Sequence, residues 1–291
     1  MVTGSHLSGS TWVGNIINSS NKVHYLHEPF NINSYNLIRT PFSNWFEYID
    51  KENTPELHKT AKAYINGLTK FDFYVFAKNL FTDPIIAKNE LQKLKRQFTQ
   101  RSLLKDPIAI FSAEWFYKEY GSKIILLIRH PAAFTASLKV KNWKHDFSHF
   151  SRQHELMQNE LKAYKKEISN FENHDHDIID QGILLWNLIY SSVLKYKMNY
   201  ENDWLFIRHE DISKDPLTYF KKIFTFLELE FEDKIKSKII QTTTASVESK
   251  LERDSTSNIK RWKDRLTEKE INKIYRGTKE LSEKFYDQSD W

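Results

Sequence analysis

The 291-residue sequence predicts an α/β fold in which helices cover both faces of a mostly parallel sheet. Short apolar strands alternate with amphipathic helices along the chain, and no internal repeat or low-complexity block interrupts them. The clearest strand is the apolar run at 123–128, which is typical of a parallel strand buried on both faces. With 40% hydrophobic residues, the chain can bury the core of one domain spanning residues 1–291.

The first predicted strand ends at Gly4 and leads into a loop and a helix. Gly4 and Gly9 have the G-x-x-x-x-G spacing of a phosphate-binding loop. Ser10 and Thr11 can open and cap the helix that follows, whose apolar side starts with Trp12. Such a loop aims backbone N–H groups and a helix N-terminus at an anion. A strand-to-helix turn without a ligand is the alternative interpretation of the same pattern.

The loop differs from the form that binds nucleoside triphosphates. That form continues Gly-Lys-Ser/Thr, because its lysine reaches the β- and γ-phosphates. Here Ser10 occupies the lysine position, so the loop predicts a 5′-phosphate group rather than a magnesium triphosphate. No acidic residue precedes Glu28, which leaves the loop and first helix without charges that repel an anion.

Further predicted strands end in polar residues that should meet at the same edge of the sheet. Residues 23–26 lead to His27 and Glu28, a short strand from residue 103 ends at Lys105, and residues 123–128 lead to Arg129. In a magnesium-dependent hydrolase such a strand would end in an acid that holds the metal. Arg129 suits a second phosphate instead, and a surface ion pair is the alternative role for it.

The remaining segments are predicted to be helical or irregular. Residues 32–98 form a mostly helical insertion, and residues 151–171 and 178–198 form two amphipathic helices. For the polar segment 173–177 a solvated loop is favoured over a metal site, because five consecutive residues cannot easily face one ion. The aromatic residues of the insertion either line an acceptor pocket or belong to the core: Trp45, Phe46, Tyr48, Phe71, Phe73, Tyr74 and Phe76.

Composition narrows the class of protein. The net charge is +5, but 43 basic and 38 acidic residues are interleaved, so the sequence favours small anionic partners and not nucleic acid. The absence of cysteine excludes disulfides, thiolate zinc sites and cysteine nucleophiles. Neither a membrane span nor a secretory signal is visible, which predicts a cytoplasmic protein. Because Met1 directly precedes the first strand, we expect a few further residues upstream in the natural chain; nothing predicts an oligomeric state.

Five segments, in this order, resemble the sulfotransferase family, and more closely its bacterial and carbohydrate-type branch. They span nearly the whole chain: residues 4–12, 26–30, 128–138, 208–211 with Pro216, and 262–267. The resemblance implies a three-layer, P-loop nucleotide-hydrolase-like fold. It also implies 3′-phosphoadenosine 5′-phosphosulfate as co-substrate, adenosine 3′,5′-bisphosphate as product, and no metal.

The same resemblance implies how the nucleotide is held. The loop Ser8, Gly9, Ser10 and Thr11 would bind the 5′-phosphosulfate, and Trp12 would lie against the adenine. Arg129 and Ser137 would bind the 3′-phosphate by charge-assisted hydrogen bonds. Lys260 and Arg261 belong to a late segment, following a polar loop at 254–258, that would close over the nucleotide.

Catalytic roles follow from the resemblance as well. Glu28 is the predicted base and His27 the second candidate; on an extended segment they would point to opposite faces, so only one should reach the donor. The family commonly has Lys or Arg directly before the Ser-Gly of its loop, where this chain has Leu7. Lys105 is the predicted substitute cation, and a salt bridge from it to Asp106 or Glu28 is the alternative.

The resemblance therefore implies sulfuryl transfer to a hydroxyl of a small molecule or glycan, with a saccharide or glycolipid as the favoured acceptor. Leu7 keeps open a weakened or non-catalytic relative that binds a nucleotide or glycan. A P-loop kinase is a further alternative, against which the missing lysine of the loop argues.

Overall fold

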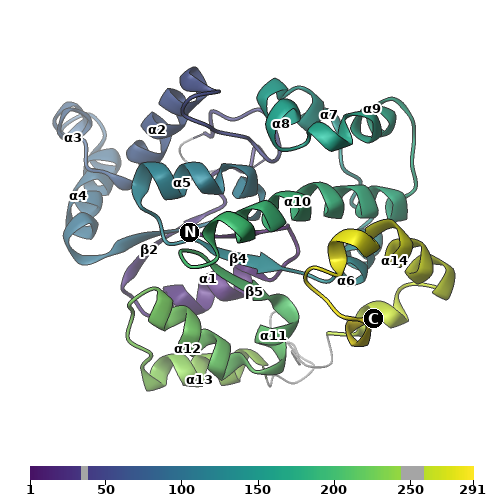
Figure 1. Cartoon of the computed structure of the whole chain (residues 1–291). Helices are drawn as coiled ribbons and strands as arrows, with labels where there is room; N and C mark the ends of the chain where they lie inside the picture. Colours follow the sequence, from purple (N-terminus) through teal and green to yellow (C-terminus); the bar gives the residue numbers. More distant parts are fainter. Residues whose placement is uncertain (34–38, 244–258) are drawn as a thin grey trace.

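A five-stranded parallel sheet forms the centre of the protein in the computed structural model, which describes residues 1–33, 39–243 and 259–291 (Figure 1). Its strand order is β2-β3-β1-β4-β5, and every neighbouring pair is parallel. The carboxyl ends of all five strands therefore lie at one edge, as predicted. The strands are β1 Val2–Gly4, β2 Val23–His27, β3 Arg101–Lys105, β4 Ile125–Ile128 and β5 Leu205–Arg208.

Helices cover both faces of the sheet, which gives the three layers that the sequence predicts (Figure 1). One face packs against α5 (Ala113–Tyr120) and α10 (Ile178–Tyr200), and the other against α1 (Ser10–Asn18), α12 (Pro216–Phe226) and α13 (Asp233–Thr243). The other α-helices are α2 Pro55–Thr69, α3 Phe73–Asn79, α4 Pro84–Thr99, α6 Pro131–Lys141, α7 Ser148–Ser151, α8 His154–Asn159, α9 Lys165–Asn173, α11 His209–Lys214 and α14 Glu268–Ser282. Short 3₁₀ helices are η1 Pro107–Ser112, η2 Lys162–Tyr164, η3 Arg261–Asp264 and η4 Gln288–Asp290.

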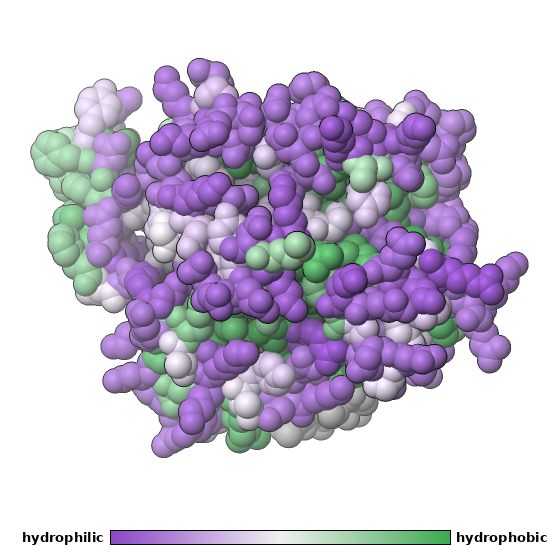
Figure 2. Space-filling view, in the orientation of Figure 1, coloured by the Kyte–Doolittle hydropathy of each residue, from purple (hydrophilic) through white to green (hydrophobic). Residues whose placement is uncertain are grey.

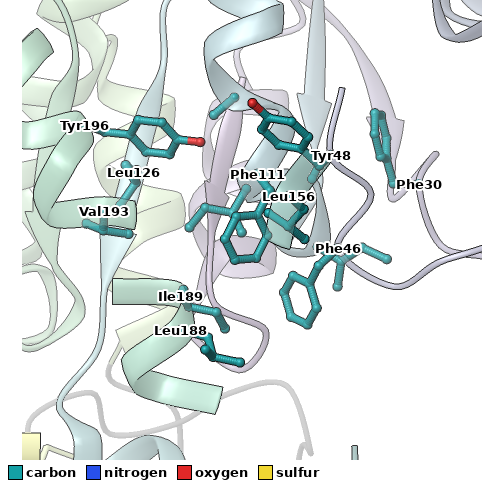
Figure 3. Close-up of a cluster of buried hydrophobic side chains, with 14 of the residues drawn as sticks. Phe30, Phe46, Tyr48, Phe111, Leu126, Leu156, Leu188, Ile189, Val193 and Tyr196 are labelled. Atoms are coloured by element: carbon teal, nitrogen blue, oxygen red, sulfur yellow. The ribbon is translucent and has the colours of Figure 1, made fainter. Parts of the chain in front are cut away.

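Strand β4 shows why the sheet is buried on both faces. Leu126 and Ile128 belong to the core beneath α5 and α10, part of which is drawn in Figure 3. Ile125 and Leu127 belong to the second core, beneath α1 and α12. Burying one such side chain fully stabilises the fold by roughly 1.5–3 kcal/mol relative to leaving it exposed. A continuous apolar run, rather than an alternating one, is therefore what this position requires.

The start of α1 differs from the prediction. The helix begins at Ser10, but its N-cap is Gly9 at φ +88°, and no side chain caps it. The expected capping by Ser10 and Thr11 is therefore wrong. Glycine serves here because its backbone reaches the left-handed region without a Cβ clash. Gly4 is equally constrained, since a Cβ there would lie 2.5 Å from the Leu127 carbonyl oxygen.

The helix predicted over 151–171 is broken into α8, η2 and α9. The break lets Leu161 donate its N–H to the Leu156 carbonyl at 2.9 Å while both side chains stay fully buried. The helix predicted over 178–198 is confirmed as α10. Asp177 caps it by accepting from the N–H groups of Ile179 and Asp180.

The polar segment before α10 is mainly a connection. Asn173 ends α9, and His176 stacks on Phe171 with ring centroids 3.7 Å apart. Among the described residues, no group of three or more His, Asp or Glu side chains is arranged to hold a metal ion.

The insertion at 32–98 is mostly helical over its described part, as predicted, and contains α2, α3 and α4. Its aromatic residues have different environments. Phe46 and Tyr48 lie in the core, whereas Phe73 and Tyr74 are 71% and 72% exposed. Trp45 lies near the loop after β1, where it contacts the ring of His6.

Candidate functional site

The loop after β1 is closed by its own backbone and supported from behind. The Ser8 N–H donates to the Ser5 carbonyl at 3.2 Å, and the Ser5 hydroxyl lies 2.9 Å from the Tyr190 hydroxyl. Ser8 is fully buried, yet its Oγ has no hydrogen-bond partner among the described residues. A buried hydroxyl without a partner is costly, so this atom fits a loop that receives a polar ligand.

His209, the first residue after β5, lies against this loop. A Cβ at Gly9 would be 2.5 Å from His209 Nδ1, so only glycine allows the ring to approach so closely. Burial, together with the charge of Arg129, lowers the pKa of His209 to about 3, so the ring is neutral. Its position at a strand end was visible in the sequence, but nothing there indicated contact with the loop.

Arg129 and Ser137, the two predicted ligands of the 3′-phosphate, lie close together. An Arg129 Nη2 hydrogen bond to Ser137 Oγ measures 3.5 Å, and Ser137 Oγ in turn donates to the Ala133 carbonyl at 2.9 Å. Within the described part of the chain, the buried Nε of Arg129 has no partner. Burial lowers the pKa of Arg129, and the nearby Glu210 opposes that shift. An arginine stays protonated in such a setting, so this group can bind an anion.

Helix α10 links the loop after β1 to Arg129. The Tyr190 hydroxyl accepts the Arg129 backbone N–H at 2.8 Å while it contacts Ser5, and the Trp186 indole donates to the Arg129 carbonyl at 2.9 Å. Sequence reasoning assigned these residues to packing only, because their i, i+4 spacing on an apolar helix face gives no sign of a polar role.

Glu28 and Lys105 meet at the exits of β2 and β3. Lys105 Nζ lies 2.5 Å from Glu28 Oε1, and the lysine side chain is fully buried. His27 Nε2 is 4.0 Å from the same oxygen. The expectation that His27 and Glu28 point to opposite faces is wrong, because the chain leaves the extended conformation at Glu28, where φ is +47°.

The charge state of Glu28 is set by its neighbours. Partial burial raises the pKa of its carboxyl, but the hydrogen bond and charge of Lys105, with His27 and Asn31, outweigh this and lower the pKa overall. Glu28 is therefore a carboxylate at neutral pH. The structure shows the salt bridge to Glu28 that the sequence left open for Lys105.

Asp106 connects the segments that follow β2 and β3 by hydrogen bonds. Its carboxylate accepts the N–H groups of Phe30 at 2.7 Å and Ile108 at 3.0 Å. Complete burial raises the pKa of Asp106 to about 7 in spite of these hydrogen bonds. This residue holds the backbone that carries Glu28.

His6 and Leu7, in the loop after β1, pack against apolar and aromatic side chains. Leu7 is partly buried against the apolar core and has φ +63°. His6 is 5% exposed, and its ring lies 5.1 Å from that of Trp143 and 6.4 Å from that of Trp45. Burial lowers the pKa of His6 to about 3, with Glu28 acting in the opposite direction. A cluster of aromatic rings therefore flanks the loop.

The other residues predicted to contact the nucleotide are Ser10, Thr11, Trp12, Lys260 and Arg261. Ser10 is buried and Thr11 exposed at the start of α1. Trp12 donates its indole N–H to Thr242 at 3.1 Å, and Lys260 Nζ donates to the Ser289 carbonyl at 3.1 Å. Arg261 begins η3. The polar loop predicted at 254–258 lies outside the described residues.

A cavity of about 400 Å³ opens at the opposite edge of the sheet, near the amino ends of the strands. Its lining includes Met1, Val23, Arg101 and Lys123. Because the loop after β1 and Glu28 lie at the carboxyl ends of the strands, this cavity belongs to a different part of the molecule.

The sequence model described as the sulfotransferase family matches residues 1–233 of this chain. The chain belongs to the sulfotransferase family. The parallel sheet and the loop after β1 are thus the P-loop-like α/β fold of a sulfotransferase, and membership supports sulfuryl transfer as the general activity. No curated protein matches the chain in sequence.

Solved sulfotransferase structures resemble the chain only distantly. A sulfotransferase domain from the curacin biosynthetic pathway is 16% identical with a TM-score of 0.46, and the match covers 96% of each chain. A mouse sulfotransferase complexed with PAP is 14% identical, with a TM-score of 0.45 and coverage of 98% of this chain and 84% of that one. A Mycobacterium avium sulfotransferase is 13% identical, with a TM-score of 0.47 and coverage of 98% and 76%.

Proposed function

We propose that this sulfotransferase moves a sulfuryl group from 3′-phosphoadenosine 5′-phosphosulfate to a hydroxyl of its acceptor. The observation that carries the proposal is the pairing of two anion positions at one sheet edge. One is the loop with the partnerless Ser8 hydroxyl, and the other is Arg129 with Ser137. A donor with phosphate groups at two separate ends suits this arrangement better than a triphosphate, which needs one continuous loop.

Each part of the donor has residues that fit it. The loop Ser8 to Thr11 and the N-terminus of α1 would hold the 5′-phosphosulfate. Arg129 and Ser137 would hold the 3′-phosphate, Trp12 would lie beside the adenine, and Lys260 with Arg261 would close over the nucleotide. The bound donor supplies the sulfuryl group. The protein binds the donor, orients the acceptor and accepts the proton of the acceptor hydroxyl.

Glu28 would accept the proton of the acceptor hydroxyl. Its carboxylate is ionised, and its lowered pKa means that it holds that proton only transiently. Lys105, 2.5 Å away, would offset the negative charge that grows on the departing phosphate, in place of the cation missing at Leu7. His27 lies close enough to Glu28 to act as the second candidate base.

The aromatic group beside the loop supports a saccharide or glycolipid acceptor. Trp45 and Trp143 meet edge to face at 5.6 Å, and Trp143 is 37% exposed. Indole rings beside the loop are suited to packing on the apolar faces of a sugar ring. The acceptor hydroxyl would then lie between these rings and Glu28.

Leu7 favours a second candidate, a weakened or non-catalytic member that still binds the nucleotide. Its side chain packs on the core instead of presenting a charge to the loop. In such a member Lys105 serves only as the partner of Glu28.

The experiment that tests the proposal is thermal unfolding of the full chain with adenosine 3′,5′-bisphosphate, compared with magnesium ATP. A ligand at a hundred times its dissociation constant stabilises by about 2.7 kcal/mol, on the order of several degrees for a chain of this size. We expect the shift with the bisphosphate. A shift with magnesium ATP alone would reject the proposal.

A further inference from the structure

Helices α3 and α4 form a hairpin at the β2 edge of the sheet, away from the site described above (Figure 1). The term basic–apolar hairpin is used here for residues 70–101. Two contacts of α4 fix it in place: Arg96 binds the ring of His24 in β2 at 3.0 Å, and Lys93 donates to the Gly67 carbonyl at 2.6 Å. The outward surface of the hairpin is left without protein cover in the described chain.

That surface is unusually apolar. Thirteen large apolar side chains are exposed in the described part of the protein, and eight of them lie on the hairpin. Phe81, in the turn, is 90% exposed, and Phe98, near the end of α4, is 83% exposed. Figure 2 shows green side chains gathered over α3 and α4. Apolar exposure concentrated in this way marks an interaction surface, whereas scattered single residues do not. The eight are Phe73, Tyr74, Leu80, Phe81, Ile85, Ile86, Leu91 and Phe98.

The same segment also has a net positive charge that is large for its length. It has seven basic and three acidic residues, a net charge of +4 compared with +5 for the whole chain. All three acids are engaged locally: Asp72 and Asp83 cap α3 and α4, and buried Glu90 pairs with Lys93 at 2.5 Å. The basic residues are Lys70, Lys78, Lys88, Lys93, Lys95, Arg96 and Arg101.

Cations and apolar groups share one stripe along α4. Lys88, Leu91, Lys95 and Phe98 follow each other at spacings of three and four residues, and all four are exposed. A helix that presents basic and apolar side chains together is suited to the boundary between lipid headgroups and acyl chains. A second copy of the hairpin fits this surface poorly, since pairing would place the lysines of both copies together.

We propose that the basic–apolar hairpin docks this protein on the surface of an anionic lipid bilayer. Phe81 and Phe98 enter the headgroup region while Lys88 and Lys95 contact lipid phosphates. The attachment is peripheral, since none of the helices in the described ranges has the length and apolar content to cross a bilayer.

The test is co-sedimentation of the full chain with vesicles of phosphatidylcholine alone or with 30% phosphatidylglycerol at 0.1 M salt. We expect binding to the phosphatidylglycerol vesicles and release at 0.5 M salt. Neutralising two lysines by Lys88→Gln with Lys95→Gln should weaken partitioning by about thirtyfold. The matched control is Lys221→Gln with Lys222→Gln, which removes two exposed lysines from α12 and should leave partitioning unchanged.

A second pair of variants tests the contribution of the exposed apolar side chains of the hairpin. Phe81→Ser with Phe98→Ser should abolish sedimentation, while Leu217→Ser with Met198→Ser, which change two exposed apolar residues elsewhere, should not. All variants must keep the wild-type circular dichroism spectrum. Equal binding to both kinds of vesicle, or no binding to either, would overturn the proposal. So would a concentration-dependent dimer, seen by light scattering, that the Phe81 and Phe98 substitutions abolish.

Discussion

At the residue scale, one substitution tests the proposed role of Glu28 as the base. Glu28→Gln should keep bisphosphate binding, because the loop and Arg129 are unchanged. It should lower the rate of sulfuryl transfer, once an acceptor has been identified, by about a hundredfold to ten-thousandfold. The measurements are the thermal shift with bisphosphate and turnover at saturating donor. His27→Gln is the control and should retain most of the turnover. Full activity of Glu28→Gln would move the role of base to His27.

Leu7 gives a second test at this scale. Leu7→Arg should raise turnover at least tenfold if a cation next to the loop is what the enzyme lacks, since one such donor is worth about a hundredfold to a thousandfold. The uncharged control Leu7→Met should leave turnover near the wild-type value. Lower turnover in Leu7→Arg would mean that another cation already stabilises the departing phosphate and that Leu7 packs beside it. Lys105 is the candidate for that cation.

At the scale of elements, α10 connects the two proposed anion positions through the hydroxyl of Tyr190. Tyr190→Phe should weaken bisphosphate binding by about tenfold or more, because the buried Arg129 N–H and the Ser5 hydroxyl both lose a partner and each loss costs about 1–3 kcal/mol. The measurement is the dissociation constant by calorimetry. Tyr200→Phe, on the same helix and bonded to Glu114, should leave that constant unchanged. An unaltered constant in Tyr190→Phe would remove the tyrosine from the site.

The elements also show which local features a sequence pattern reveals. The apolar run of β4 and the spacing along α10 predicted their structures well, because a long periodic pattern commits many residues to one environment. The break between α8 and α9 was missed, since the burial of Leu161 depends on neighbours distant in sequence. The cap of α1 was misassigned because Gly9 is fixed by the approach of His209, some 200 residues later.

At the scale of the whole molecule, buried histidines should set the response to acid. Burial lowers the pKa of His6, His130, His145 and His209 to about 3 each, so these rings are neutral when folded and take up protons on unfolding below pH about 6.5. Their contribution to stability is present above that pH and is lost as the pH falls toward 3. Asp106, with its pKa raised to about 7, acts in the opposite sense and stabilises as the pH falls through 7.

The variant His145→Phe isolates one of these groups. Its ring lies among Phe46, Phe147 and Phe150, where phenylalanine fits. Between pH 7 and pH 5 the free energy of unfolding, measured with urea, should fall by about 2 kcal/mol less in the variant than in the wild type, because the wild-type ring takes up a proton only on unfolding. An unchanged slope would show that His145 is already protonated in the folded protein.

The sequence by itself determined the class of fold, the order of strands and helices, and the set of polar residues at the strand ends. These follow from local rules: apolar runs, glycine spacing and the position of a residue at the end of a strand. Only the tertiary structure decided how those residues pair. The contact of Lys105 with Glu28, the turn that brings His27 beside Glu28, and the link from Tyr190 to the loop all join residues far apart along the chain or depend on a backbone angle. No local pattern encodes such contacts, because packing of the sheet against its helices sets them.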